Sequence, residues 1–197
     1  MILEGEIVIY IRIFLFAGLL LHKLVWELLK RQDQTQAKTR MPMRFGIKSI
    51  VKAIKMVALF LLIVQTLFLN LLPITNDPGR IEILGIFIYL LGLAVALTGR
   101  LQLGKNWVDL EDYRVLPEQK LVQNGIYRYI RHPIYLGDVL LVLGVELALN
   151  SWLVIGVVGL LVFVIRQALV EERLLLKSLP GYVDYHRQTK MFIPFII

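Results

Sequence analysis

Five long apolar segments constrain this chain more than any other feature of its sequence. Each has about 17 residues or more, close to the length that a helix needs to cross a hydrocarbon core of about 30 Å. Hydrophobic residues make up 57% of the 197 residues, above the share that is typical of soluble domains. The pattern predicts an all-α integral membrane protein with five transmembrane helices, over residues 7–29, 56–72, 83–99, 133–149 and 152–170.

The charges between these segments predict how the chain crosses the membrane. Residues 23–55 carry nine Lys and Arg but two acids, whereas residues 70–80 carry one base and one acid. By the positive-inside rule, the first link is cytoplasmic and the second is external. The N-terminus is then outside, and residues 100–132 and the C-terminal tail are cytoplasmic. Because the bases follow membrane topology, the net charge of +7 does not indicate a nucleic-acid partner.

The last two segments are separated only by residues 150–151, which predicts a helical hairpin. Residues that are equally far from the turn lie at similar depth if both helices are regular. Tyr135 is then level with Arg166, and the acids at 171–172 are level with residues 129–130. Polar residues from both arms should therefore meet at one membrane interface. Ionisable groups there are candidates for function, because they are costly inside a membrane unless they are paired.

A loop precedes the fourth segment, and it can supply backbone hydrogen bonds. Pro133 suits the first turn of a helix, where no amide donor is needed, so the helix should begin there with His132 just outside it. A loop that meets a helix N-terminus offers free backbone amides, which can bind a carboxylate or the edge of an adenine ring. The chain has no cysteine, which excludes thiolate chemistry and cysteine-based metal sites, and we expect no metal.

Short motifs follow one another through roughly residues 103–194. They are GKNW at 104–107, KLV at 120–122, GIY at 125–127, RHPIYLG at 131–137, EE at 171–172, and GY at 181–182 with Tyr185 and Pro194. In order and spacing they resemble the isoprenylcysteine carboxyl methyltransferase family of membrane enzymes, which also looks related to phospholipid N-methyltransferases. The resemblance suggests N-terminal transmembrane helices over residues 1–99 and a catalytic region over residues 100–197.

The resemblance implies S-adenosylmethionine as the cofactor, bound by a cytoplasmic loop and the ends of the last two helices, with a C-terminal helix beside them. It also implies a lipophilic acceptor that enters from the membrane lipids. Carried over residue by residue, the cofactor-binding positions are Gln119, Lys120, Leu121, Val122, Tyr127, His132, Pro133, Ile134, Tyr135 and Glu172.

Arg166 and Glu171 are the candidate catalytic residues. Methyl transfer from a sulfonium is an in-line displacement that needs alignment and a dry pocket, so neither a metal nor a triad is required. A carboxylate acceptor, as in isoprenylcysteine-like O-methylation, is ionised near neutral pH and needs only a cation to orient it. In the family that this chain resembles, an arginine shortly before the paired acids helps to orient the substrate. Ala168 occupies the matching position here, so Arg166 is the candidate for that role. For an amine acceptor, His132, Glu171 or Asp138 could accept a proton.

Other functions stay open beside O-methylation. A phospholipid N-methyltransferase would share the same motifs. Sterol reductases have a similar C-terminal hairpin but bind NADPH, which needs a basic cluster and more room than the short loop at 100–131 offers. A non-catalytic membrane scaffold would keep the hairpin alone. The sequence leaves the roles of Asp138 and Glu146 open.

Overall fold

The computed structural model describes residues 2–36, 47–107 and 119–194, and this part of the chain is helical with no strand. The α-helices are α1 (Ile2–Gln36), α2 (Ile47–Phe68), α3 (Gly79–Leu103), α4 (Pro133–Ala148), α5 (Gly156–Ser178) and α6 (Tyr182–Gln188). Three short 3₁₀ turns are η1 (Gly104–Asn106), η2 (Gly125–Arg128) and η3 (Trp152–Ile155). The all-α prediction is confirmed.

Three of the described helical stretches are long and apolar enough to cross a membrane: Glu6–Gln32, Gly79–Asn106 and Trp152–Ser178. The length and hydropathy of these three helices make the chain an integral membrane protein. α4 has only 16 residues, fewer than the roughly 20 that cross a bilayer, so the count of five spans stays a prediction. The division of the chain at residue 99 also stays a prediction, and α3 runs across it.

Two predicted boundaries are corrected. Residues 69–72 are not helical, because α2 ends at Phe68 and Arg12 of α1 binds carbonyls of its last turn, donating to Gln65 O at 3.1 Å and to Thr66 O at 2.8 Å. The last helix continues beyond residue 170 to Ser178, because its final turns still have a buried face. Leu175 packs there with Leu179 and Tyr182.

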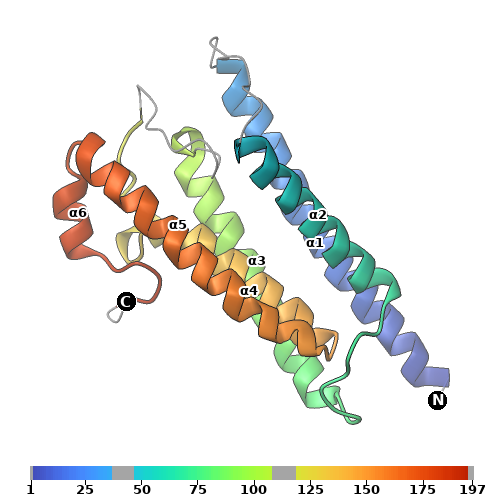
Figure 1. Ribbon diagram of the computed structural model, residues 1–197. Helices are drawn as coiled ribbons and strands as arrows, with labels where there is room; N and C mark the ends of the chain where they lie inside the picture. Colours follow the sequence, from blue (N-terminus) through green and yellow to red (C-terminus); the bar gives the residue numbers. More distant parts are fainter. Residues whose placement is uncertain (1, 37–46, 108–118, 195–197) are drawn as a thin grey trace.

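The predicted hairpin of the last two segments is present, and α4 is buried most extensively against α3. Figure 1 shows α4 and α5 side by side, with α3 running along α4. Glycines let α3 and α4 approach closely: a Cβ at Gly92 would lie 2.4 Å from Leu141 N, and one at Gly144 would lie 2.3 Å from Tyr89 N. Close backbone approach at small residues is a common way to pack helices in membranes.

Buried polar residues fix the end of the bundle that lies near the N-terminus. Gln65 of α2 donates from Nε2 to Glu146 Oε2 of α4 at 2.8 Å, and Asn150 donates from Nδ2 to Thr75 O at 2.7 Å. These bonds give Glu146, whose role the sequence left open, a partner on another helix. They also tie the hairpin turn to the link between α2 and α3.

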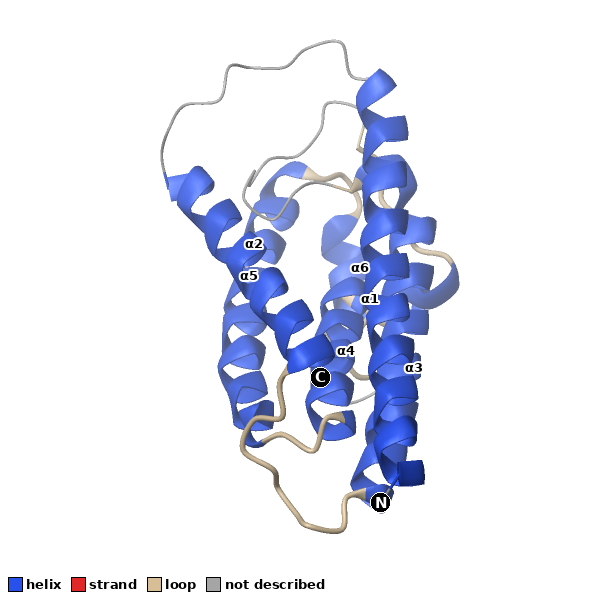
Figure 2. Ribbon diagram, turned by 90° about the vertical axis from the view of Figure 1, so that its right-hand side faces the viewer, coloured by secondary structure: helices blue, strands red, loops and turns tan. Residues whose placement is uncertain are grey.

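The chain after α6 returns to the start of α4. Arg131 N donates to Lys190 O at 2.8 Å, His132 N donates to Met191 O at 3.1 Å, and Lys190 N donates to Tyr129 O at 3.2 Å. Figures 1 and 2 show α6 at the end of the molecule remote from the N-terminus. The C-terminal segment therefore lies against the residues that the sequence singled out as a site.

Candidate functional site

A pocket opens where the loop before α4, the first turns of α4 and the second half of α5 meet. Eight of the ten predicted cofactor-binding residues line it: Gln119, Lys120, Leu121, Val122, Tyr127, His132, Ile134 and Tyr135. Glu171 of α5 lines the same pocket. The structure therefore brings together most of the positions that were carried over from the family, although they come from three separate parts of the chain.

Three of the predicted site residues do not line this pocket. Pro133 occupies the first position of α4, as expected, and is buried there. Glu172 is also buried and belongs to the pocket's supporting wall. Arg166 is exposed on α5. Counting from the turn predicts a depth for Arg166 but not its direction around the helix axis, and this side chain is not among those that line the pocket with Tyr135.

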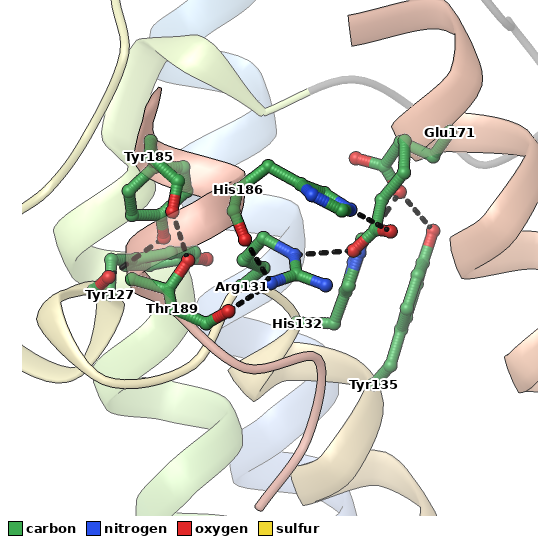
Figure 3. A network of polar contacts seen from close by, with 9 residues as sticks. Tyr127, Arg131, His132, Tyr135, Glu171, Tyr185, His186 and Thr189 are labelled. Atoms are coloured by element: carbon green, nitrogen blue, oxygen red, sulfur yellow. Dashed lines mark hydrogen bonds and ion pairs between the residues drawn. The ribbon is translucent and has the colours of Figure 1, made fainter. Parts of the chain in front are cut away.

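Glu172 is the centre of a hydrogen-bond network, and Figure 3 labels its partners Arg131, His132 and His186. Its Oε1 accepts from Arg131 Nε at 2.6 Å and lies 3.1 Å from His132 Nε2, while its Oε2 lies 3.1 Å from His186 Nε2. Arg131 also donates to His186 O at 3.1 Å and to Thr189 O. One carboxylate thus joins α5 to the start of α4, to α6 and to the C-terminal segment.

Of the two adjacent acids on α5, Glu171 is the one that lines the pocket. Its side chain is 42% exposed, against 5% for Glu172. Glu171 Oε2 accepts from Tyr135 Oη at 2.8 Å and lies 3.9 Å from His132 Nδ1. The rings of His132 and Tyr135 are stacked, with centroids 5.3 Å apart and planes 4° from parallel. The pocket wall therefore combines an accessible carboxylate with two aligned rings.

Three buried tyrosines hold the loop and α6 in place. Burial raises the pKa of Tyr185 to about 12 and raises those of Tyr127 and Tyr182 as well, so all three hydroxyls keep their protons near neutral pH. Tyr185 Oη donates to Tyr127 O at 2.7 Å, and Tyr127 Oη donates to Gly99 O at 3.3 Å. These bonds connect α6 to η2 and η2 to α3.

The sequence prediction missed several lining residues, among them Gln167, Tyr182 and Tyr185. Gln167 lies one turn before Glu171 on the same face of α5, so helical spacing alone could have found it. Tyr182 and Tyr185 reach the pocket only because α6 folds back beside η2. The family resemblance predicts a C-terminal helix beside the cofactor, but it does not indicate which side chains of that helix reach the pocket.

The chain is similar to known proteins in both sequence and fold. The model of the phospholipid methyltransferase family matches residues 81–180. Protein-S-isoprenylcysteine O-methyltransferase of Tribolium castaneum is 31% identical over 127 residues, which are 60% of this chain and 45% of that protein. The cobalt-zinc-cadmium resistance protein CzcN of Cupriavidus metallidurans is 31% identical over 107 residues, 53% of this chain and 47% of that one. The chain spans about half the length of these curated relatives.

The fold also resembles a solved structure, that of the eukaryotic intramembrane Ras methyltransferase ICMT, isoprenylcysteine carboxyl methyltransferase. The TM-score is 0.61 with 21% sequence identity, and the alignment covers 94% of this chain and 68% of that one. The family match contains all of α4 and α5, most of α3, and the loop before α4. It thus includes most of the residues that line the pocket.

Proposed function

Because the chain belongs to the phospholipid methyltransferase family, we propose that it transfers a methyl group from S-adenosylmethionine to a lipophilic acceptor. The observation that carries this proposal is the pocket at one end of the helical bundle, where Glu171 meets the 119–122 segment and the stacked rings of His132 and Tyr135. The pocket lies at the membrane interface that we predict to be cytoplasmic, so a polar cofactor enters from water and the acceptor from lipid.

The residues of the pocket fit this cofactor. Its ammonium and sulfonium groups are cations, and Glu171 offers a partly exposed carboxylate. The rings of Trp107, Tyr135 and Tyr182 line the same space, and aromatic faces attract cations. When bound, the cofactor supplies an electrophilic methyl group on sulfur.

The protein's contribution is to position the reactants and to exclude water. Tyr135 fixes the carboxylate of Glu171 through its hydroxyl. The buried pair of Arg131 and Glu172 fixes the turn into α4, with only 7% and 5% of the two side chains exposed. Leu174, Leu175 and Leu179 supply an apolar wall. No protein nucleophile is required for this chemistry.

The pocket supports a reductase function less well. Among the described residues that line the pocket, the cations are Lys120, Arg131 and, when protonated, His132. Arg131 is held by Glu172 at 2.6 Å, so its charge is already neutralised. An NADPH 2′-phosphate needs several available cations, whereas S-adenosylmethionine needs anionic and aromatic partners.

Isothermal titration of the purified full-length protein tests the proposal, with S-adenosylhomocysteine and NADPH as parallel ligands. We expect micromolar binding of S-adenosylhomocysteine, weaker binding in His132→Ala, and unchanged binding in Asp184→Asn. Asp184 is a suitable control because its side chain is 78% exposed on α6, outside the pocket lining. Binding of NADPH alone by folded protein would refute the methyltransferase proposal.

A further inference from the structure

His22 and Asp138 form a polar pair within the helical bundle, and neither residue is among those that line the pocket. His22 Nε2 of α1 is 3.1 Å from Asp138 Oδ1 of α4. The side chains of His22 and Asp138 are 21% and 42% exposed, so the pair is accessible from one side. Ionisable groups in a membrane-spanning region are costly unless they are paired, and they commonly mark functional sites.

The helical geometry places this pair next to the pocket. Asp138 lies one turn beyond Ile134 and Tyr135, so it shares their face of α4, and both of those residues line the pocket. It is therefore deeper in the bundle than the cofactor-facing wall. A lipophilic molecule that approaches from the membrane side would pass Asp138 before it reached Tyr135.

One face of α1 runs from the pair to the pocket. The ring of Trp26 stacks on His22, with centroids 4.2 Å apart. One turn further, Lys30 Nζ lies 5.9 Å from the ring centroid of Trp107, and Trp107 lines the pocket. His22, Trp26 and Lys30 recur every fourth residue, which puts them on the same side of the helix. Asp138 and the pocket are thus bordered by one continuous helix face.

We infer that Asp138, held in position by His22, receives an amine head group of the lipophilic acceptor and takes its proton. This inference rests on the proposed methyltransferase function. His22 contacts Oδ1 of Asp138, and the structure gives this carboxylate no other polar partner among the described residues. Its second oxygen is therefore available to a cation, and an ammonium on a lipid tail matches both the charge and the apolar surroundings.

The two partly exposed acids favour an amine over a carboxylate, and Lys120, a cation of the pocket lining, is an exposed residue of the loop before α4 and not of α4 itself. Asp138 and Glu171 both present partly exposed acidic side chains, which would repel a carboxylate acceptor. The cation expected to orient a carboxylate, Arg166, is exposed on α5 and outside the pocket lining. Arg131 is neutralised by Glu172.

The proposed chemistry balances in two steps. The ammonium of the acceptor gives one proton to the carboxylate of Asp138 and becomes a neutral amine. The nitrogen lone pair then forms a bond to the methyl carbon, while the carbon–sulfur bond breaks and its electron pair stays on sulfur. The products are S-adenosylhomocysteine and a methylated ammonium, and Asp138 returns its proton to solvent. Asp138 is thus a catalytic residue, and His22 is a positioning residue.

The test uses the full-length protein in phosphatidylcholine nanodiscs with methyl-labelled S-adenosylmethionine. Three acceptors are compared: phosphatidylethanolamine, octadecylamine and N-acetyl-S-farnesylcysteine, which carries a carboxylate. We expect label in at least one amine and none in the carboxylate. Transfer to phosphatidylethanolamine identifies a phospholipid head group, and transfer to octadecylamine alone identifies a single-chain amine.

Variants separate this role from a structural one. Removal of a general base lowers kcat by roughly 100-fold or more, so Asp138→Asn should do so while its affinity for S-adenosylhomocysteine stays unchanged. Asp138→Glu should recover part of the rate. His22→Gln keeps a donor for Asp138 and should retain more activity than His22→Leu, and Asp184→Asn serves as the matched exposed control.

Three outcomes would overturn the inference: transfer to the carboxylate alone, an amine transfer rate in Asp138→Asn equal to wild type, or no transfer to either amine by protein that binds S-adenosylhomocysteine. Failure of the folded wild type to bind S-adenosylhomocysteine would instead refute the proposed function, together with the inference that depends on it.

Discussion

Two adjacent acids on α5 have different positions in this molecule. The sequence assigned cofactor contact to Glu172 and a catalytic role to Glu171, whereas the structure places Glu171 in the pocket lining and Glu172 in the network behind it. Successive residues of a helix point about 100° apart, so the pair cannot face the pocket together. Which of the two does so depends on what α5 packs against.

Glu172→Gln should destabilise the protein. Glu172 is 4% exposed and contacts Arg131, His132 and His186, and removal of one charge from a buried pair costs about 3–5 kcal/mol because the other charge is left unpaired. We expect a clear fall in the thermal unfolding midpoint of the detergent-solubilised protein, measured by intrinsic fluorescence. An unchanged midpoint would mean that Arg131 has another partner for its charge.

Glu171→Gln should weaken cofactor binding and leave stability nearly unchanged. Its side chain is 42% exposed, so loss of the charge leaves no buried charge without a partner. A charge-assisted hydrogen bond contributes about 1.5–3 kcal/mol, which corresponds to roughly a ten- to hundredfold rise in the Kd of S-adenosylhomocysteine. Titration calorimetry measures this change, and equal affinities in variant and wild type would exclude Glu171 as a cofactor ligand.

At the scale of helices, the close packing of α3 on α4 positions the site. Gly85 and Gly92 of α3 face backbone atoms of α4, and Gly137 and Gly144 of α4 face backbone atoms of α3. The sequence shows these glycines but not which helices they join. Their contacts fix the start of α4, and therefore His132 and Tyr135, relative to the end of α3.

Gly144→Ala should destabilise this helix pair. Its new Cβ would meet Tyr89 N at 2.3 Å, so the two backbones must separate, and overpacking of this kind costs about 1–3 kcal/mol. Gly159→Ala is the matched control, because Gly159 is also helical but a Cβ added to it would meet no atom within 4 Å. A thermal midpoint that falls in Gly159→Ala as much as in Gly144→Ala would contradict this account.

At the scale of the whole molecule, the two ends of the bundle have different polar chemistry. Arg12, Gln65 and Glu146 form buried helix-to-helix bonds near one end. The pocket and its carboxylates lie at the other end, on the side that the positive-inside rule assigns to the cytoplasm. The predicted orientation therefore places the cofactor pocket on the side where charged metabolites are available.

Cysteine labelling tests this orientation directly, because the natural sequence contains no cysteine. Asn76, in the link between α2 and α3, and Asp184, on α6, are both exposed. In intact cells, a membrane-impermeant maleimide should label Asn76→Cys and should label Asp184→Cys only after permeabilisation. The reverse pattern would invert the topology and place the pocket outside.

The sequence by itself determined that the chain is helical and apolar enough to cross a membrane, that α4 and α5 form a hairpin, and that polar residues of both arms meet, because apolar length and spacing from a turn are properties of the chain's linear order. Tertiary structure alone decided the outward direction of Arg166, the separate positions of Glu171 and Glu172, the return of the C-terminal segment to Arg131, and the pairing of His22 with Asp138 across 116 residues. The direction of a side chain around a helix axis depends on packing against distant segments, which spacing along one helix does not encode.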